Sequence, residues 1–317
     1  MYTCASLFAG VGGIDLGFEK AGVKTVYANE FDSYAADTFE KNFKIKVDRR
    51  DIHEVKASEL PDFDILLAGF PCQAFSIAGY RQGFDDEKGR GNLFFEVTRI
   101  MEEKRPRVAF FENVKNLVSH DNGNTFRVIC EQLDLLGYKY LFQVMNASEY
   151  GNIPQNRERI YIVAFRDKED YSNFSLPKSI PLTKSIKDVI DFDGEKDEKF
   201  YYTPEKCSFY DELKRSMVTS DTIYQWRRVY VRENKNNLVP TLTANMGTGG
   251  HNVPLILTHD SRIRKLTPRE CFNVQGFPKT FKLPDQSNGR LYKQAGNSVV
   301  VPVITRIAKS IILALSN

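Results

Sequence analysis

The segment "TCASLFAGVGGIDLGF", residues 3–18, joins a short apolar run to an amphipathic stretch through a glycine turn. The apolar run predicts a β-strand, and the stretch after the glycines predicts a helix that Gly22 closes. Gly10, Gly12 and Gly13 allow a tight turn in which a ligand can approach the backbone where a helix starts. The segment therefore predicts a strand–turn–helix unit with a binding loop.

The same alternation continues through the first 165 residues. Further strands are predicted in "KTVYANE", "DFDILLAG", "RVAFFEN" and "RIYIVAF", and helices in "SYAADTFEKNF", "LFFEVTRIMEEKR" and "NTFRVICEQLDLLG". Several strands are apolar on nearly every residue, which is typical of strands covered on both faces. We therefore predict an α/β fold with a doubly wound, mainly parallel sheet, in which ligands bind beyond the carboxyl ends of the strands.

The pattern changes after about Asp167. The stretch "DFDGEKDEKFYYTPEKCSFYDELK" mixes charged and aromatic residues without a clear period, which indicates a smaller and less regular domain. Helical periodicity returns in "VPVITRIAKSIILALS", whose apolar face is expected to pack on the first domain. We predict a first domain over 1–175, a second over 176–285, and a C-terminal segment over 286–317 that returns to the first.

Composition excludes several classes of protein. The 317 residues, 42% hydrophobic and 27% charged, suit one large domain with a smaller companion. No run approaches 18 uncharged apolar residues, and the N-terminus lacks a basic leader, so we expect a cytoplasmic protein that does not bind a membrane. The five cysteines are far apart, without a CxxC pair or a Cys/His cluster, which argues against disulfides and a metal site.

The net charge of +3 is too small to indicate a polyanionic partner, but the charges are unevenly distributed. Residues 199–269 contain 12 Lys and Arg against 6 Asp and Glu, a local excess of 12 − 6 = +6. This segment is either an ordinary solvated surface or a surface that faces phosphates.

Two acidic residues follow predicted strands near the glycine turn. Glu30 ends the second strand, where a carboxylate can bind the two hydroxyls of a ribose, and Asp51 lies where a third strand would end, suited to an adenine amino group. Both are equally common as helix caps. Together with the turn, they indicate a nucleoside-bearing cofactor and give little reason to expect a pyrophosphate.

Cys72 follows the strand "DILLAG" in the loop "GFPCQAFS". A free cysteine is usually buried and inert. The rigid Phe70-Pro71 lead-in, the strand-end position and the glycine-rich segment after it favour a reactive thiol beside a loop that moves.

Other strand ends carry a carboxyl group and two guanidinium groups. Glu112 ends the strand "RVAFFEN", and Arg157 and Arg159 are two residues apart, which would place them on one face of a strand. Ordinary ion pairs would explain them singly. As a set, they predict a reactive site near the nucleoside pocket.

With these motifs the sequence resembles the DNA (cytosine-5) methyltransferases of bacterial restriction–modification systems over nearly the whole chain. "FAGVGG" is similar to the family's cofactor loop, "GFPCQAFS" to its nucleophile loop, "ENV" to its glutamate motif and "QNRERIYIV" to its arginine motif. "RKLTPRECFNVQGFP" and "YKQAGNSVVVPV" resemble the last two motifs. Six motifs in the family's order make the resemblance specific.

The resemblance implies roles for four side chains. Cys72 would add to carbon 6 of cytosine, which makes carbon 5 able to accept a methyl group. Glu112 would donate to ring nitrogen 3 and Arg159 would hold the carbonyl oxygen, while Arg157 would lie near the nucleophile loop and favour the thiolate. Because carbon 6 is inaccessible in a stacked duplex, the target cytosine would have to flip out.

The resemblance also implies S-adenosyl-L-methionine as cofactor. Glu30 would bind its ribose, Asp51 and Ile52 its adenine, and Phe31 would stack on the adenine. The methionine side would contact Phe8, Gly10, Val11 and Gly13, and the rest of the pocket would come from Pro71, Leu93, Asn297 and Ser298.

The partner implied is double-stranded DNA, and residues 176–285 would form a target-recognition domain beside the catalytic domain over 1–175. The DNA contacts that we expect are Gln73, Ser76, Arg227, Arg228, Arg232 and Thr241. Arginine commonly reads guanine, but each of these residues is as well explained by phosphate contact or by a surface position. We expect a monomer that needs no metal, with a cognate restriction endonuclease encoded nearby.

Three rival hypotheses stay open. Some relatives of this fold methylate transfer RNA by the same chemistry. A nucleotide-dependent oxidoreductase would use the glycine turn and Glu30, but would leave Cys72, Glu112 and the arginines without a task. A catalytically inactive DNA-binding relative would not need all the reactive positions, which are filled here.

Overall fold

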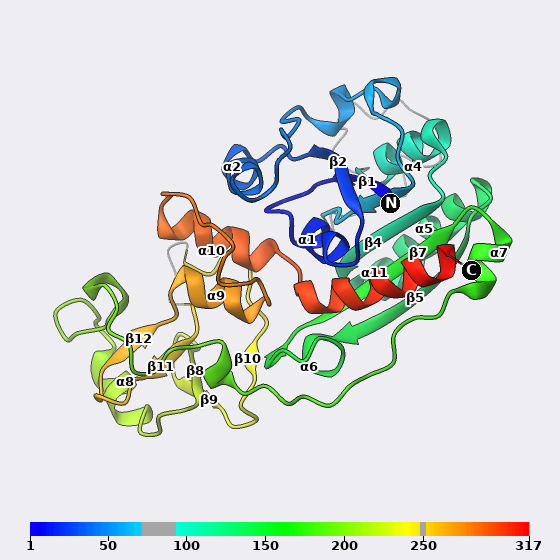
Figure 1. The fold of residues 1–317 in the computed structure, drawn as a ribbon. Helices are drawn as coiled ribbons and strands as arrows, with labels where there is room; N and C mark the ends of the chain where they lie inside the picture. Colours follow the sequence, from blue (N-terminus) through cyan, green and yellow to red (C-terminus); the bar gives the residue numbers. More distant parts are fainter. Residues whose placement is uncertain (72–92, 248–251, 317) are drawn as a thin grey trace. The chain divides into compact units, whose positions relative to one another are not determined.

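The computed structural model describes residues 1–71, 93–247 and 252–316 (Figure 1). The chain forms two compact units, each built from separate stretches of sequence. Unit 1 contains Met1–Met145, Glu158–Pro177 and Ile304–Asn317, and unit 2 contains Asn146–Arg157 and Lys178–Val303. The functional boundaries expected at 175 and 285 stay a prediction, because compactness does not test what each part does.

Unit 1 is built on a six-stranded sheet of order β2-β1-β3-β4-β7-β5. β1 pairs in parallel with β2 and β3, and β3 pairs in parallel with β4, while β7 runs antiparallel to β4. The mainly parallel α/β fold is therefore confirmed. The strands are β1 (Thr3–Leu7), β2 (Lys24–Asn29), β3 (Ile65–Ala68), β4 (Val108–Val114), β5 (Lys139–Asn146) and β7 (Glu158–Phe165).

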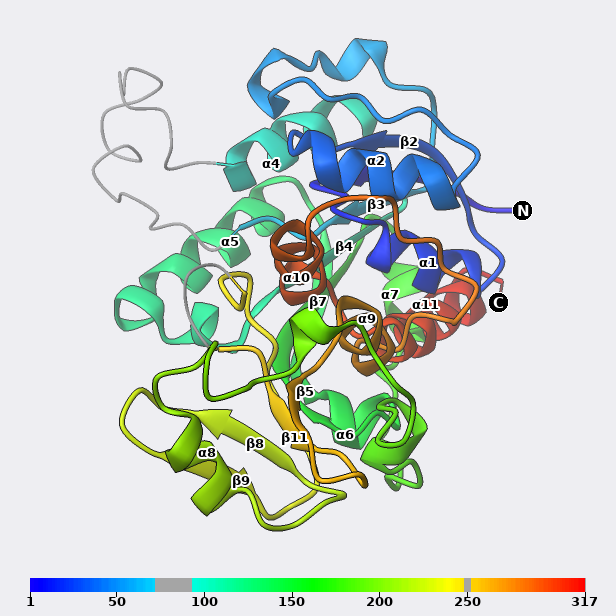
Figure 2. The ribbon, with the colours of Figure 1, turned by 90° about the vertical axis from the view of Figure 1, so that its left-hand side faces the viewer.

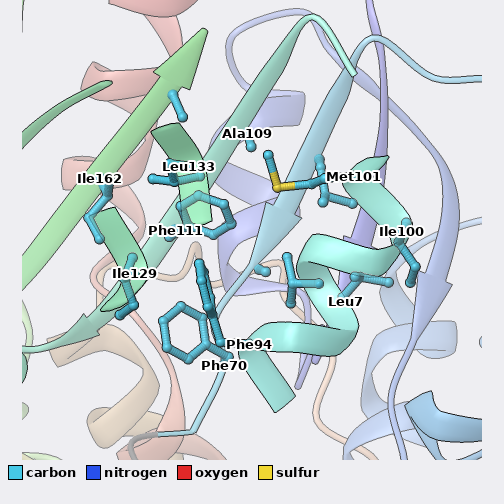
Figure 3. Packing of buried hydrophobic residues seen from close by; sticks show 14 of the residues in the cluster. Leu7, Phe70, Phe94, Ile100, Met101, Ala109, Phe111, Ile129, Leu133 and Ile162 are labelled. Atoms are coloured by element: carbon cyan, nitrogen blue, oxygen red, sulfur yellow. The ribbon is translucent and has the colours of Figure 1, made fainter. Parts of the chain in front are cut away.

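Helices cover both faces of this sheet, as a doubly wound arrangement requires. On one face, α4 and α5 pack on alternate strand residues. The rings of Phe70, Phe94 and Phe111 meet there in tilted and edge-to-face contacts beside Ile129 and Ile162 (Figure 3). The helices of unit 1 are α1 (Gly13–Glu19), α2 (Ser33–Asn42), α4 (Leu93–Lys104), α5 (Asn124–Leu135), α7 (Lys168–Asn173) and most of α11 (Val301–Leu315).

On the opposite face, α1 packs through Phe18 on Phe110, with ring centroids 5.3 Å apart. α11 lies against α1, because a Cβ atom on Gly17 would come 2.4 Å from Cγ2 of Ile304. The prediction that the C-terminal helix packs on the first domain is thus confirmed. One described helical stretch, Asn288–Leu315, contains an 18-residue window apolar enough to span a membrane, but 61% of that window is buried in the protein, as in the core helix of a folded domain.

The strand β5 was missing from the predicted strands. It lies at the edge of the sheet, and most of its residues are exposed or half-buried. An edge strand of this kind lacks the continuous apolar run that marked the central strands.

Unit 2 contains a four-stranded sheet of order β12-β11-β8-β9 and a two-stranded pair of β10 and β6. β8 and β9 form an antiparallel hairpin that is visible in Figure 2. The strands are β6 (Gln155–Asn156), β8 (Ile223–Trp226), β9 (Val231–Asn234), β10 (Val239–Pro240), β11 (Leu255–Leu257) and β12 (Ile263–Lys265), and the helices are α6 (Ala147–Tyr150), α8 (Tyr210–Ser216), α9 (Pro268–Val274) and α10 (Asn288–Asn297).

Candidate active site

The glycine turn between β1 and α1 holds a shaped loop beside Glu30. Phe8, Gly10 and Gly12 all have positive φ, at 54°, 55° and 84°. A Cβ atom on Gly12 would come 2.3 Å from Cε2 of Phe43, whereas one on Gly10 would meet nothing within 4 Å. Gly12 is therefore needed for packing, and Gly10 leaves open space on the loop.

Glu30 follows β2 and faces this loop. Its carboxylate accepts the backbone N–H of Gly10 at 2.8 Å and that of Asp32 at 2.7 Å. A carboxylate has about four acceptor positions, so the side chain is oriented but still able to accept hydroxyl groups. This geometry suits the ribose role that was expected of Glu30.

The prediction of a strand that ends at Asp51 is wrong. The chain makes only an isolated bridge between Asn29 and Asp48, and Asp51 instead caps the short 3-10 helix Ile52–Glu54. The Asp51 carboxylate accepts the backbone N–H of His53 at 3.1 Å, which lowers its pKa. The short segment between α2 and β3 pairs too little to form a strand. The Asp51 side chain is still partly exposed to solvent.

The other unit 1 residues expected to bind the cofactor differ in what they expose. The Val11 and Ile52 side chains are buried, so only their backbone groups can face a ligand. Phe31 is 69% exposed, which is unusual for a phenylalanine and leaves its ring available for stacking. Gly13 is buried at the start of α1, Leu93 packs on the core cluster at the start of α4, and Pro71 is exposed.

Cys72, Gln73 and Ser76 lie outside the described residues. The residues that precede them are held firmly. Phe70 is buried, and its carbonyl oxygen accepts the Nδ2–H of Asn113 at 2.8 Å, while the Oδ1 of Asn113 accepts the backbone N–H of Val114. The end of β4 thus fixes the chain two residues before Cys72.

The four cysteines in the described part of the chain contrast with the role expected of Cys72. Burial raises the pKa of each of these thiols, namely Cys4, Cys130, Cys207 and Cys271. A thiol is a poor nucleophile when it is held protonated. None of these four therefore has the electrostatic surroundings of a reactive cysteine.

Glu112 and Arg159 meet near the carboxyl end of β4, where the antiparallel strand β7 begins. In the antiparallel ladder Glu112 lies opposite Tyr161, so Arg159, two residues before Tyr161, is its diagonal neighbour on the same face. The Nε of Arg159 is 3.2 Å from Oε1 of Glu112, and the two side chains are 15% and 12% exposed. A Cβ atom on Gly69 would come 3.8 Å from Oε2 of Glu112, so this pair lies beside the chain that leads to Cys72.

The prediction that Arg157 and Arg159 lie on one strand face is wrong. Arg157 occupies a break between β6 and β7 and belongs to unit 2, whereas Arg159 belongs to β7 of unit 1. Arg157 is 3% exposed, and its guanidinium group donates to three backbone carbonyl oxygens, those of Leu242, Gly296 and Ser298. The alternation rule fails because the strand is interrupted between the two arginines.

The arginines expected to contact DNA lie on the β8–β9 hairpin of unit 2. Arg227 and Arg228 form its turn, Arg232 lies on β9, and all three are exposed. Within the described residues, no ion pair engages their guanidinium groups. Trp226, the last residue of β8, stacks on Phe209 with ring centroids 4.1 Å apart and planes 3° from parallel. This contact packs the end of the hairpin against the rest of unit 2.

Thr241 and the two C-terminal pocket residues also belong to unit 2. The Thr241 hydroxyl donates to the carbonyl oxygen of Asn156 at 2.6 Å, so it has a structural partner. Asn297 ends α10 and Ser298 follows it. The Ser298 Oγ is buried, and no hydrogen-bond partner for it exists among the described residues.

Asn113 and Asp15 of unit 1 have structural roles that were not predicted from the sequence. Asn113 stood next to Glu112 in the "ENV" motif, but its hold on Phe70 follows only from the pairing of neighbouring strands. Asp15 is fully buried and accepts the hydroxyl groups of Ser6 at 2.9 Å and Thr25 at 3.1 Å. No motif in the sequence marked Asp15 as a buried acid. The described ranges 1–71, 93–247 and 252–316 contain no cluster of side chains suited to a metal ion.

Comparisons with known proteins agree with this geometry. The family model for C-5 cytosine-specific DNA methylases matches residues 2–313. The Type II methyltransferase M.Bsp6I of Bacillus sp. (strain RFL6) is 62% identical over 312 residues, covering 98% of each chain. The Type II methyltransferase M.HhaI of Haemophilus parahaemolyticus is 41% identical over 318 residues, covering 96% of this chain and 92% of that one.

Solved structures agree at the level of the fold. The crystal structure of a mutant of Spodoptera frugiperda DNMT2 has a TM-score of 0.76 at 20% identity and covers 98% of this chain and 100% of that chain. The family match spans nearly the whole chain and includes both the glycine turn and the paired Glu112 and Arg159. The chain therefore belongs to the C-5 cytosine-specific DNA methylase family.

Proposed function

We propose that this DNA cytosine-5 methyltransferase acts on a cytosine flipped out of duplex DNA, through a covalent adduct on Cys72. The observation that carries the proposal is the Glu112–Arg159 pair, which lies beside Gly69 and the chain leading to Cys72. A carboxyl group and a guanidinium group on one face can bind the polar edge of a pyrimidine, while a thiol attacks its ring.

The proposed reaction begins at carbon 6. The Cys72 thiolate forms a carbon–sulfur bond there, and the ring electron pair moves toward nitrogen 3, which takes a proton from Glu112. Arg159 hydrogen-bonds the carbonyl oxygen and stabilises the charge that develops on it. Carbon 5 is then nucleophilic enough to accept a methyl group. A base removes the carbon 5 proton, the carbon–sulfur bond breaks, and the thiolate leaves. Nitrogen 3 then returns its proton to the Glu112 carboxylate, which releases neutral 5-methylcytosine.

S-adenosyl-L-methionine is the methyl donor that we propose. When bound, it supplies an electrophilic methyl group to carbon 5. The residues of unit 1 fit such a cofactor, because Gly10 leaves open space beside the oriented carboxylate of Glu30 and Phe31 exposes its ring. In unit 2, the buried hydroxyl oxygen of Ser298 has no hydrogen-bond partner among the described residues. Phe8, Val11, Gly13, Asp51, Ile52, Pro71, Leu93 and Asn297 would complete the pocket.

We infer that residues 176–285 recognise the DNA target, and that 1–175 and 286–317 serve catalysis and cofactor binding. The exposed arginines of the β8–β9 hairpin would contact phosphates or guanine edges, and Gln73, Ser76 and Thr241 would lie near the flipped cytosine. Phosphate contacts would offset the cost of flipping the base, on the order of a few kcal/mol.

The names of the relatives place them in Type II systems. We propose the same setting here, in which a cytoplasmic monomer protects host DNA from a restriction endonuclease encoded nearby. Arg157 has no direct catalytic task in this proposal, because its guanidinium group is held by backbone carbonyl oxygens.

A covalent trap tests the adduct. Duplex DNA that contains 5-fluorocytosine at the target position cannot lose a proton at carbon 5, so the wild type should form a stable adduct visible by denaturing electrophoresis. Cys72→Ser should abolish it. The matched control is Cys130→Ser, which changes a thiol of the described part of the chain and should leave the adduct intact. An adduct in Cys72→Ser would overturn the mechanism.

The role of Glu112 has its own test. Glu112→Gln cannot donate a carboxyl proton and should lower kcat by about 10²–10⁴. The affinity for S-adenosyl-L-methionine should stay within about threefold of wild type. Glu158→Gln is the control, because Glu158 is an exposed carboxylate paired with Lys115. Lost cofactor binding in Glu112→Gln would instead mark Glu112 as a structural residue.

Two measurements identify the substrate. Transfer of labelled methyl groups to duplex DNA, but not to transfer RNA, is the expected result. Bisulfite sequencing of DNA from a host that expresses the chain should then reveal one recurrent sequence around the methylated cytosine. Methylation of transfer RNA alone would replace the substrate class.

A further inference from the structure

Arg157 joins two segments of unit 2 that are about 50 residues apart in the sequence. Its Nη1 donates to the carbonyl oxygen of Leu242 at 2.7 Å, and its Nη2 donates to those of Gly296 at 3.0 Å and Ser298 at 2.6 Å. Leu242 begins the loop over 242–247, and the other two residues belong to the segment 295–298, which is the last turn of α10 and its C-cap Ser298 and is called the turn below. One buried guanidinium group therefore binds both segments directly.

Two buried glutamines form a second, indirect link between the same segments. Gln155 accepts the backbone N–H of Leu242 at 3.4 Å and donates to the side-chain oxygen of Gln275 at 3.0 Å. Gln275 donates to the carbonyl oxygen of Ala295 at 2.7 Å. Both glutamines are fully buried. Gln155 reaches the loop and Gln275 reaches the turn, so Arg157 is the member of this group that contacts both.

Glycines bring the same segments into direct contact. A Cβ atom on Gly296 would come 2.2 Å from the carbonyl oxygen of Thr243 and 2.6 Å from the backbone nitrogen of Ala244. A Cβ atom on Gly247 would come 2.5 Å from Cδ2 of Tyr292 in α10. The loop therefore lies with its backbone on the turn and cannot move far unless the turn also moves.

These two segments have different expected tasks. The loop follows Thr241, which we expect to face DNA, and the turn carries Asn297 and Ser298, which we expect to face the cofactor. Resting on that proposed function, we propose that Arg157 is a positioning residue that couples cofactor binding to DNA binding. Ordering of the turn by the cofactor is transmitted through Arg157 to the loop, so that each ligand raises the affinity for the other.

Hydrogen exchange of the wild-type protein is the first test. S-adenosyl-L-methionine alone, without DNA, should slow exchange in peptides that cover 238–247 as well as in those that cover 290–300. Protection confined to 290–300 would overturn the coupling. Failure of the wild type to bind the cofactor or to methylate plasmid DNA would instead overturn the proposed function, and this inference with it.

Variants provide the second test. Calorimetry should show that methylatable plasmid DNA raises the wild-type affinity for S-adenosyl-L-homocysteine by about 5–150-fold. In Arg157→Lys, which keeps the charge but loses the bidentate fork, the enhancement should fall below about 2-fold while the affinity without DNA changes little. Gln275→Met removes a hydrogen bond to the turn and the hydrogen bond from Gln155, but leaves every Arg157 contact in place. It is the comparison variant and should retain more of the enhancement than Arg157→Lys.

A purely structural role predicts a different result. Arg157→Lys and Gln275→Met would then lower the melting temperature and leave the enhancement unchanged. If Arg157→Lys does not fold, Gly296→Ala keeps the Arg157 side chain but pushes apart the two segments that it joins, and should also reduce the enhancement. Full enhancement in a folded Arg157→Lys or Gly296→Ala protein would overturn the inference.

Discussion

Unit 1 and unit 2 hold their interiors together in different ways. In unit 1 the four central strands and the helices α4 and α5 bury one large apolar cluster. Unit 2 has a smaller cluster around Leu213, Tyr224, Leu255 and Ile263. Its interior adds buried polar groups, among them the ion pair of Arg264 with Glu270, whose side chains are 0% and 4% exposed.

The two units differ in how regular a backbone their interiors must hold in place. Apolar packing tolerates many sequences provided that volume is kept, whereas buried hydrogen bonds require particular partners. Unit 1 is built on a regular sheet whose ladders satisfy most backbone groups, so apolar packing carries most of its interior. Unit 2 positions irregular loops, whose backbone groups need side-chain partners such as Arg157 and Gln275 because no regular ladder satisfies them.

Removal of Arg264 should have the largest effect on this comparison. Arg264→Ala leaves the Glu270 carboxylate buried without its bidentate partner, which should lower the free energy of unfolding of unit 2 by about 3–5 kcal/mol. Arg262 lies two residues before Arg264 and forms an exposed pair with Glu198. Arg262→Ala breaks that pair and should lower the free energy of unfolding by at most about 1 kcal/mol. Hydrogen exchange resolved by peptide measures each unit separately. Similar losses of unfolding free energy in Arg264→Ala and Arg262→Ala would contradict the claim that the buried ion pair contributes more to stability than the exposed one.

The next largest effect should come from Gly12→Ala in unit 1. The new methyl group would come 2.3 Å from Phe43, and the φ of 84° is unfavourable for alanine, so we expect about 2–4 kcal/mol of destabilisation. Gly10→Ala meets no atom within 4 Å and should lose less stability but more cofactor affinity. Chemical denaturation and calorimetry together distinguish the two glycines. Equal loss of stability would contradict this division of tasks.

A buried acid of unit 1 gives a smaller effect that depends on pH. Burial raises the pKa of Asp15 to about 6, above its usual value of 3.8. Protonation therefore favours the folded state, and this contribution is complete below about pH 3.8 and lost as the pH rises through about 6. Asp15→Asn should raise the free energy of unfolding at pH 8 by about 1–3 kcal/mol and give no gain at pH 4. The same gain at both pH values would contradict this linkage.

The smallest effect should come from His259 of unit 2, which is exposed. Its ring nitrogens lie 2.5 Å from Oδ1 of Asp193 and 2.8 Å from Oδ1 of Asp221, and Lys187 also pairs with Asp221. The two carboxylates raise the pKa of His259 above 6.5, so its contribution is complete below that pH and lost as the pH rises through the raised value. His259→Gln should slightly lower the melting temperature at pH 6 and leave it unchanged at pH 9. A decrease at pH 9 of equal size would contradict the ionic origin.

Much of unit 1 followed from sequence patterns. The strands around Ala5, Leu67 and Phe110 were predicted because strands covered on both faces leave continuous apolar runs. Glu30 and Glu112 were identified because strand ends meet at one edge of a parallel sheet. The exposed strand β5 was missed, because it leaves no continuous apolar run. The strand expected to end at Asp51 was wrong, and the alternative of a helix cap is the one observed.

The sequence alone determined the family and the order of its motifs, together with the central strands and helices of unit 1. These features depend on local propensity, on hydrophobic period and on short motifs, all of which involve residues close in the chain. Only the tertiary structure decided the tasks of the two arginines. Arg159 meets Glu112 because β7 runs antiparallel to β4, and Arg157 meets Leu242 and Ser298 because distant segments converge on it. Partners so far apart in the chain leave no local pattern.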